Sequence, residues 1–548
     1  MELIASKKIQ TQRGSALALV LVMVVVVSII LTSLLTFITS QVTYSKDKVE
    51  RERAFQIAEA GVYYYRWYLA HKVEGKTVQQ IADFWESGNP QGVGDALEVE
   101  YKDPEGAAIG MYSLEVTKPP SGSTIVTVKS TGWTYLKPSV RRIVQVRFRR
   151  PSWSESVALA NDEMRFGQGT TITGKIQSNQ GVRIDGVATN VVSSSLASYD
   201  DPDHCETAWT WAWDGHQFVK TCNFKKSEFG VHTHINAPPS SGENDTFRQS
   251  EAPPSAVPSR SDIFQGGRSF PVTQFDFTSL VSDISFMRTN ASIKYDNTGQ
   301  GRYIKFHADG TMDTCKVNAF DSSTNDITNY SGVVTGANSG NGSTCVTIAC
   351  CVLSTCGWID SDKHGKGKCV SMTNPTIPDI GIIFVANNVW LEGTINEKSV
   401  TVVAAELTDE PNYVSGHKNV FLGKNDLLYT NTDGRDVIGI IAQNNVEIIK
   451  NSQDNLTIDA ALLAKEGRVG RNSYGNKKST ITINGSIATN IRYGFTYVGS
   501  NSYNCGNGVY IDNGYCTRNL NFDNNLLYYP PPYFPTGTEY SIDLWDEL

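Results

Sequence analysis

Cysteine and histidine are the residues of this 548-residue chain with the clearest capacity for chemistry. The ten cysteines begin only at Cys205, and an even number in one region is typical of disulfides formed in an oxidising compartment. We expect the local pairs Cys205–Cys222 and Cys505–Cys516. The other six allow many connectivities, among which the sequence cannot choose. These six are Cys315, Cys345, Cys350, Cys351, Cys356 and Cys369.

Metal binding is the alternative chemistry for this region. Several histidines lie in or near it, and histidine and cysteine are the usual ligands of zinc. However, no Cys-x-x-Cys is followed by a second ligand pair at zinc-finger spacing. We therefore favour disulfides and predict no metal site and no cofactor. The histidines concerned are His204, His216, His232, His234 and His364.

Catalytic signatures are missing from the sequence. It has no nucleophile elbow, no His-Glu-x-x-His, no P-loop and no EF-hand loop. An enzyme built on stacked β-strands would need charged groups that converge on one face. Candidates exist, but scattered charges are expected on any exposed surface, so we predict no catalytic residue and no enzyme. The candidates are Asp433, Arg435, Asp436 and Asp459.

The N-terminus carries a membrane-targeting pattern. Lys7, Lys8 and Arg13 precede a run with no charged residue, proline or glycine between Gly14 and Lys46. An apolar helix of about 20 residues matches the roughly 30 Å hydrocarbon core of a membrane. The preceding positive charges place the N-terminus in the cytoplasm and the rest of the chain outside. The membrane-helix residues include Leu17, Leu19, Val24, Ile30 and Ile38.

Past the apolar run the helix can continue to about residue 70, far beyond what a membrane requires. Helix formers dominate there, and Gly61 is the only weak position. A helix from Ser15 to about residue 70 would be about 80 Å long. Apolar residues recur at spacings of three and four and form one face of the helix. A charged collar at 50–53 comes just before this face in the sequence. That face comprises Ala54, Ile57, Ala58, Gly61, Tyr65 and Tyr68.

These first 70 residues resemble type IV pilin-like proteins, and most closely the PilX-type N-terminal region of minor pilins. The resemblance implies that a prepilin peptidase cuts between Gly14 and Ser15 and methylates the new N-terminus. It also implies that the helix packs among other pilin subunits. The matching pieces are Gln12-Arg13-Gly14, Ala16-Leu17-Ala18-Leu19, the apolar helix, and Arg53-Ala54 leading to Ala58-Glu59-Ala60-Gly61. The assembly residues it implies are Arg51, Arg53, Ala54, Ala58, Glu59 and Gly61.

One position departs from the pattern of major pilins. Those proteins carry Glu at the fifth mature position, where it pairs with the N-terminal amine of a neighbour, whereas this chain has Leu19. Minor and tip-type pilins often lack that Glu, so the departure favours a rare or tip subunit. The alternative for the whole region is a signal anchor with a long helix and no pilus.

Beyond the leader (1–14) and helix (15–72), the sequence predicts a mainly β chain that begins with a small α+β head at 73–155. A short helix is expected at 78–86, and strands near 112–116, 124–130 and 140–149. The last of these strands is strongly basic. We expect an edge strand protected by its charge, with contact to an acidic partner subunit or to phospholipid headgroups as the alternative.

The rest of the chain has short strands rich in Ile and Val and punctuated by Gly and Asn, at 156–200 and again at 375–521. This texture predicts a parallel β-solenoid, with a β-sandwich as the alternative. Between the two blocks, 201–374 is predicted to be a Cys-rich insertion and is our candidate contact surface. The Pro-rich tail at 522–548 is expected to cap the last coil of the solenoid.

Together these features predict a minor pilin-like subunit of a type IV pilus or related filament, rare or at its tip. Its large extracellular domain would serve adhesion or assembly, with a host surface or a carbohydrate as a candidate ligand. The expected location is the cytoplasmic membrane by a single span, and then the cell surface. A formal net charge of -8 argues against nucleic acid as a partner. A membrane-anchored adhesin outside any pilus and a tethered polysaccharide-active enzyme are the alternatives.

Overall fold

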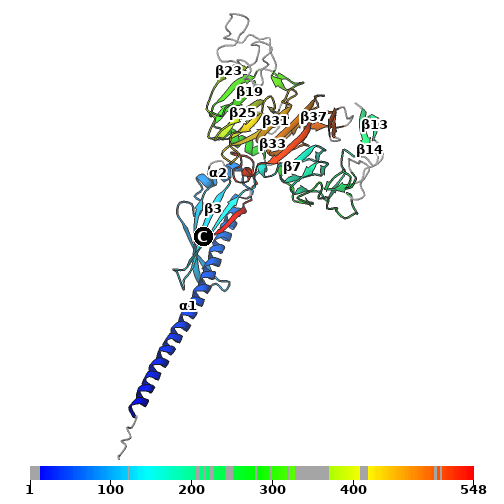
Figure 1. Cartoon of the computed structure of the whole chain (residues 1–548). Helices are drawn as coiled ribbons and strands as arrows, with labels where there is room; N and C mark the ends of the chain where they lie inside the picture. Colours follow the sequence, from blue (N-terminus) through cyan, green and yellow to red (C-terminus); the bar gives the residue numbers. More distant parts are fainter. Residues whose placement is uncertain are drawn as a thin grey trace, which may run out of the picture.

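The computed structural model describes residues 13–120, 123–204, 209–213, 218–222, 227–240, 251–277, 280–296, 299, 301–317, 320–327, 369–407, 417–498, 503–506, 509–537 and 539–548. In Figure 1 a long helix leads into a narrow head, and a broad β body lies at the far end of that head. One long N-terminal helix followed by a mostly β chain is the fold class that the sequence predicts.

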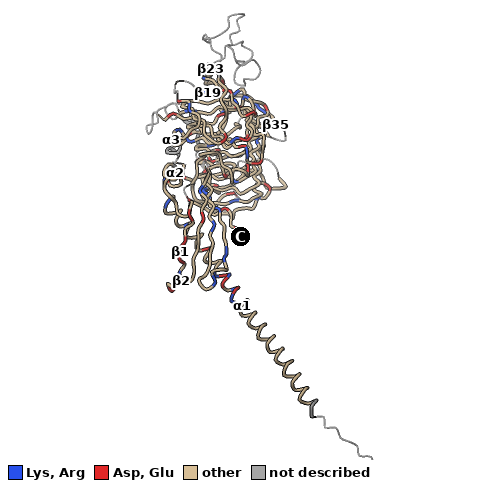
Figure 2. The backbone as a smooth tube through the Cα atoms, turned by 90° about the vertical axis from the view of Figure 1, so that its left-hand side faces the viewer, with Lys and Arg blue, Asp and Glu red and all other residues tan. Residues whose placement is uncertain are grey.

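Helix α1 (Arg13–Val73) has two halves with different surroundings. Every apolar side chain from Leu17 to Val49 is exposed, and Figure 2 shows this half free of charged residues as far as the collar. Its threonine hydroxyls bond to carbonyl oxygens four residues earlier, as Thr32 does to Ser28 at 2.7 Å. The helix can therefore lie in lipid with its polar groups satisfied from within.

The second half of α1 packs on a five-stranded antiparallel sheet in the order β1-β2-β3-β4-β38. Helix α2 (Val78–Glu86) lies where the sequence predicts it, and Thr77 caps it in a capping box with Gln80. Ile81 and Trp85 of α2 join the core between α1 and the sheet. The strands are β1 (Leu97–Lys102), β2 (Ala108–Thr117), β3 (Val126–Thr134), β4 (Arg141–Arg149) and β38 (Ser541–Glu547).

Two glycines allow α1 to lie unusually close to the sheet. A Cβ on Gly61 would lie 2.4 Å from the Oγ of Ser130, and one on Gly132 would lie 2.3 Å from the carbonyl oxygen of Ala54. Ala54 and Ala58 are fully buried at this contact. The apolar face predicted from the sequence is therefore packed against the chain's own sheet.

The C-terminal tail does not cap the end of the body as predicted. Leu526 and Phe534 are buried against the outer side of the body, and the hydroxyl of Thr401 donates to the Pro532 carbonyl at 2.6 Å. The chain then returns to the head, where β38 pairs with β4. Strand β4 is thus an interior strand, because acidic residues at the chain's own end neutralise its arginines and occupy its free edge.

The body is built from parallel ladders within one 22-stranded sheet. Their inward residues are Ile, Val and Leu, which form one continuous core. The first ladder contains β18 (Ile293–Tyr295), β24 (Ile380–Val385), β26 (Ser399–Ala404), β29 (Val437–Ala442), β31 (Asn455–Ala464), β33 (Lys477–Thr489), β5 (Ala158–Ala160), β8 (Ile176–Ser178), β11 (Val192–Ser194) and β17 (Arg268–Ser269).

Two further ladders run through the body, and the second of them shares β31 and β33 with the first ladder. One contains β19 (Gly301–Phe306), β25 (Val389–Ile395), β27 (Val420–Leu422), β30 (Val446–Ile448) and β32 (Val469–Arg471). The other contains β25, β28 (Leu427–Tyr429), β31, β33, β37 (Asn513–Phe522), β7 (Thr170–Thr173) and β10 (Val187–Ala188). Parallel stacking disfavours the β-sandwich, whose sheets are antiparallel. The β-solenoid remains our interpretation of these ladders.

The remaining elements are not part of these three parallel ladders. Strands β6 (Met164–Phe166), β9 (Val182–Ile184) and β16 (Val231–His232) form a separate parallel sheet. The others are β12 (Ser198–Tyr199), β13 (Trp209–Trp213), β14 (Phe218–Cys222), β15 (Glu228–Phe229), β20 (Met312–Val317), β21 (Phe320–Asp321), β22 (Asp326–Ile327), β23 (Cys369–Thr373), β34 (Thr496–Tyr497), β35 (Tyr503–Gly506), β36 (Val509–Ile511), helix α3 (Leu280–Asn290) and the short helices η1 (Trp153–Glu155) and η4 (Asn524–Leu527).

The order of strands in the body differs from their order in the sequence. Residues 158–188 stack on the C-terminal block, because β5 pairs with β33 and β7 pairs with β37. Arg518 joins the two blocks: its Nη1 donates to the Cys516 carbonyl at 2.7 Å and its Nε to Thr170 Oγ1 at 3.0 Å. Burial lowers the pKa of Arg518 to about 10, and the guanidinium stays charged at neutral pH.

The segment 201–374, predicted to be an insertion, contributes to the body. Strands β18, β19 and β20 join the large sheet, and Ile304 and Phe306 of β19 are buried in its core. Cys505 and Cys516 form a disulfide, as predicted, and Cys315 is also disulfide-bonded. The predicted pair Cys205–Cys222 stays a prediction. The side chains of Cys205, Cys222, Cys345, Cys350, Cys351, Cys356 and Cys369 lie outside the part of the chain that is described.

Candidate functional site

The exposed half of helix α1 carries most of the large exposed apolar side chains among the described residues. Its most apolar stretch has a mean hydropathy of 3.0 and none of it is buried, which meets the length and composition required to cross a membrane. Gly14 and Ser15 lie in the first turn of this helix. The predicted membrane residues Leu17, Leu19, Val24, Ile30 and Ile38 are all exposed along it.

A charged collar marks the point where α1 leaves the head. Glu50 is buried and accepts a 2.6 Å hydrogen bond from the hydroxyl of Thr134, at the end of β3. Arg53 donates to the same carboxylate at 2.9 Å. Asp47 forms an ion pair with Lys137, in the loop that follows β3. These contacts fix the exposed half of the helix to the head.

The predicted assembly residues divide into two groups. Arg51 and Arg53 are exposed and Glu59 is half-buried, so they can face another molecule. Ala54, Ala58 and Gly61 are buried against the chain's own sheet. Their assignment to contacts between subunits is therefore wrong, because small residues at helical spacing serve close packing within a subunit equally well.

The charged residues considered for catalysis have structural partners. Asp433 and Arg435 form an exposed ion pair at 2.8 Å. Asp436 is buried and accepts the backbone N–H of Asn431 at 2.6 Å. Asp459 accepts from the backbone of Tyr429 and from Asn484. Each of these side chains thus has a role in holding turns of the body together.

A groove of about 1150 Å³ opens beside the ladders of the body and is lined by four arginines, Arg165, Arg468, Arg492 and Arg518. Arg492 forms an ion pair with Asp203, and Arg468 donates to the Arg471 carbonyl at 3.1 Å. Arg518 is occupied by the carbonyl oxygens that join the two blocks. Arg165 and Arg492 are thus paired with a carboxylate, whereas Arg468 and Arg518 donate to neutral carbonyl oxygens, which leave their positive charge in place.

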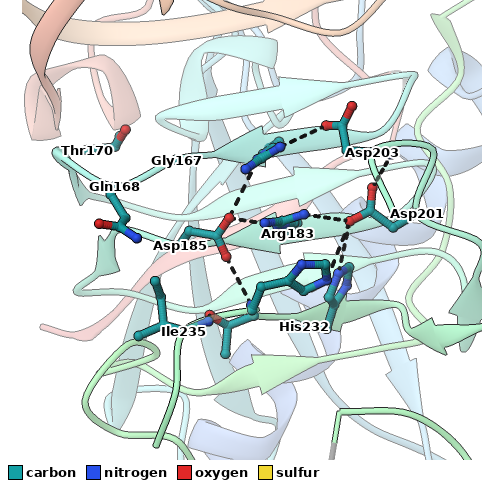
Figure 3. Close-up of polar contacts among 12 residues, drawn as sticks. Gly167, Gln168, Thr170, Arg183, Asp185, Asp201, Asp203, His232 and Ile235 are labelled. Carbon is teal, nitrogen blue, oxygen red and sulfur yellow. Dashed lines mark hydrogen bonds and ion pairs between the residues drawn. The ribbon is translucent and has the colours of Figure 1, made fainter. Parts of the chain in front are cut away.

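A cluster of buried charged residues and histidines lies on the outer side of the β6–β9–β16 sheet (Figure 3). Side chains alternate along a strand, so the inward Val182 and Ile184 leave Arg183 facing outward. Arg165, Arg183 and His232 stand in register on the three neighbouring strands. The segments around β12 and β15 cover them.

The contacts in this cluster are dominated by carboxylates. Arg183 donates from Nε to Asp185 at 2.6 Å and reaches Asp201 at 3.3 Å. His232 Nε2 and His234 Nε2 lie 3.4 and 3.7 Å from Oδ2 of Asp201. The side chains of these five residues are at most 4% exposed.

A second pair of residues extends the cluster. His204 Nδ1 lies 3.6 Å from Oε1 of Glu228, and both side chains are at most 3% exposed. The rings of His204 and His234 are 5.4 Å apart, and those of His232 and His234 are 5.1 Å apart. Two groups could each hold a metal ion: Asp201 with His232 and His234, and His204 with Glu228 and His234.

The protonation states in the cluster follow from burial and charge. Burial lowers the pKa of His232, and the nearby Asp201 offsets this only in part. Burial alone would raise the pKa of Asp201, but His232 and Arg183 outweigh it and hold that pKa well below its usual range. At neutral pH the cluster thus combines an ionised carboxylate with a neutral imidazole.

One signal for this cluster is visible in the sequence. His232 and His234 are two residues apart, which places both on one face of an extended segment. Zinc-finger spacing does not detect this pair, which is why the sequence predicts no metal site here. His216 and His364, which we grouped with them, lie outside the described residues.

Comparisons with known proteins single out the N-terminal region. A protein-family model described as PilX N-terminal matches residues 13–62. Among solved structures, the chain is similar to the competence-associated pilin ComZ from Thermus thermophilus, with 14% sequence identity and a TM-score of 0.27, over 91% of this chain and 97% of that chain. No curated protein matches the sequence. The family match covers the exposed helix and the collar.

Proposed function

Because a PilX N-terminal family model matches residues 13–62, we propose that this chain is a type IV pilin-like protein and a minor subunit of a type IV pilus or related filament. The observation that carries the proposal is the division of helix α1. Its first half is fully exposed and apolar, whereas its second half is buried in the subunit's own head. A helix of this kind can wait in a membrane and then pack among the helices of other subunits.

In this proposal the helix enters the membrane with Lys7, Lys8 and Arg13 on the cytoplasmic side. A prepilin peptidase then cuts between Gly14 and Ser15 and leaves the apolar helix on the mature protein. Other pilin subunits contact the exposed half of α1 and the collar, where Arg51, Arg53 and Glu59 are accessible. The head and body lie outside the membrane.

The size of the body supports a rare or tip position. It is broader than the head that carries it, and it lies at the end of the head opposite the exposed helix (Figure 1). Identical bodies on closely spaced helices would collide, because the helices of a bundle pack only about 8–10 Å apart. A subunit at the tip, or one rarely incorporated, avoids this collision.

We assign the body a role in adhesion or assembly rather than catalysis. The charged residues considered as catalytic are engaged in ion pairs and turns, and each of them is accounted for structurally. A surface or a carbohydrate is the ligand class that we propose. A membrane-anchored adhesin outside any pilus is the competing function.

Filament incorporation tests the proposal. Filaments sheared from cells should contain the wild-type chain in far smaller amounts than the most abundant pilin, as measured by quantitative mass spectrometry. A Gly14→Leu variant should stay in the membrane at full length, while a Ser15→Ala control should enter filaments normally. A wild-type chain that stays in the membrane of piliated cells would instead identify an anchored adhesin.

A further inference from the structure

We propose that His204, His232, His234 and Asp201 bind one divalent metal ion of the zinc class in a closed structural site. Glu228 then acts on the far side of His204, as the carboxylate that orients its ring. The proposal is independent of the role in a pilus, since it concerns the base of a hairpin in the body.

The ligands come from separate segments that the fold brings together. His232 ends β16, and His234 follows two residues later. Asp201 and His204 lie in the turn after β12, where the His204 N–H donates to the Asp201 carbonyl at 3.1 Å. Glu228 begins β15, and its carboxylate accepts the backbone N–H of Asp201 at 3.1 Å. The positions of all five residues are therefore set by the backbone.

The distances fit ligands around an ion better than hydrogen bonds. Asp201 Oδ2 lies 3.4 Å from His232 Nε2 and 3.7 Å from His234 Nε2. A hydrogen bond to a carboxylate is about 2.7–2.9 Å long. Ligand atoms about 2.0–2.1 Å from a tetrahedral zinc ion lie about 3.3–3.4 Å from each other. The ligand atoms of Asp201, His232 and His234 all lie within 4.8 Å of one another, as neighbours in one coordination shell do. His204 lies within the same limit of His234 but not of all three, so binding of the ion would draw its ring toward Asp201.

Burial supplies an independent observation. Neither ring nitrogen of His204 or of His232 has a hydrogen-bond partner, although the two side chains are only 3% and 0% exposed. Burying a polar group without a partner destabilises the folded state. A metal ion would satisfy one nitrogen of each ring. Because Glu228 faces Nδ1 of His204, Nε2 is the nitrogen that remains for the metal.

The composition of the site indicates the kind of ion and its role. Three imidazoles and one carboxylate suit zinc, whereas calcium and magnesium prefer oxygen ligands. Four protein ligands in a buried position leave no open place for a substrate, so the role is structural. His204 and Glu228 stand on either side of the hairpin β13–β14, and His232 belongs to the body. The ion would clamp the base of this hairpin to the body.

A network without metal is the competing explanation, in which Arg183 and Asp201 hold the histidines in place. Metal analysis of the full chain in detergent, produced without a polyhistidine tag, distinguishes the two. We expect about one equivalent of zinc per chain. After removal of the metal with a chelator, added Co²⁺ should give the strong visible absorption bands of a four-coordinate site. A wild-type chain that takes up neither Zn²⁺ nor Co²⁺ would overturn the proposal.

Variants locate the ion. His204→Ala and His232→Ala should each lose most of the bound metal, and Glu228→Gln should weaken affinity about 10- to 100-fold. His307→Ala is the matched control, because His307 is one-third exposed and pairs with Asp313 elsewhere in the body. Chelation of the wild type should also speed proteolysis at the hairpin β13–β14, which needs no variant to fold. Metal content unchanged in both His204→Ala and His232→Ala would contradict this site.

Discussion

Arg149 donates from Nε to Oδ1 of Asp543 at 3.1 Å, although the two residues are 394 positions apart in the sequence. The same carboxylate accepts from Nε of Arg147 at 2.6 Å. Through this contact the C-terminal strand β38 closes the sheet that carries helix α1. The end of the chain, after crossing the whole body, thus belongs to the head beside the membrane helix.

Replacing Asp543 by Asn should loosen β38. Asp543 is only 11% exposed, and its loss leaves Arg147 without this carboxylate and Arg149 with Glu155 as its remaining acidic partner, at an expected cost of about 1–3 kcal/mol. Hydrogen exchange of the β38 amides should speed up about tenfold or more, since about 1.4 kcal/mol corresponds to a factor of ten.

Asp433→Asn is the control for this prediction. Asp433 also pairs with an arginine, Arg435, but both side chains are more than half exposed. Exposed ion pairs contribute little to stability, so exchange in this variant should match the wild type. Equal exchange in β38 for Asp543→Asn and the wild type would mean that the arginines do not hold this strand.

A valine at Gly61 should disrupt the head of the isolated subunit. The added Cβ would lie 2.4 Å from Ser130 Oγ and 2.9 Å from the ring of Tyr112, so α1 must move away from the sheet. Overpacking of this kind costs about 1–3 kcal/mol, and the midpoint of thermal unfolding should fall. Ala60→Val, at the neighbouring half-buried position, should have a much smaller effect. A Gly61→Val variant that unfolds at the wild-type temperature but fails to enter filaments would mean that Gly61 contacts another subunit, as the resemblance implies.

Glu447 should make the stability of the body depend on pH. Burial raises the pKa of this carboxyl from 4.5 to about 7, although the Asn472 N–H donates to it at 2.5 Å. A raised pKa means that folding favours the protonated form. The stabilisation is therefore complete below about pH 4.5 and is lost as the pH rises through about 7, by up to about 3 kcal/mol.

Glu447→Gln keeps the shape of the protonated acid and removes its titration. In this variant the part of the pH dependence between about pH 4.5 and 7 should flatten, and at pH 8 the variant should unfold at a higher temperature than the wild type. Thermal unfolding of both proteins across this range is the measurement. Parallel curves for the two proteins would show that Glu447 titrates normally in the fold.

The local features of the fold could be predicted from the sequence, whereas the long-range pairings could not. Helix α1 follows from hydropathy and helix formers, and α2 lies where the sequence predicts a short helix at 78–86. The disulfide Cys505–Cys516 follows from short separation. By contrast, β5 stacks on β33, and β38 joins β4, because the register of buried side chains favours those distant partners.

The sites show the same division. The membrane half of α1 is a continuous run and needs no other part of the chain to be recognised. The apolar face around Ala58 is visible as a helical period, and the resemblance assigns it to contacts with other subunits, because a helical period cannot tell a neighbouring subunit from the chain's own sheet. The histidine cluster depends on three segments meeting at β16, and only the spacing of His232 and His234 was visible beforehand.

The mass of the N-terminus, compared between cells with and without prepilin peptidase, tests the assignment to the pilin class most directly. The account predicts a chain that begins at a methylated Ser15 when the peptidase is present and retains residues 1–14 when it is absent. An uncut N-terminus in both strains would contradict it and leave a signal-anchored surface protein.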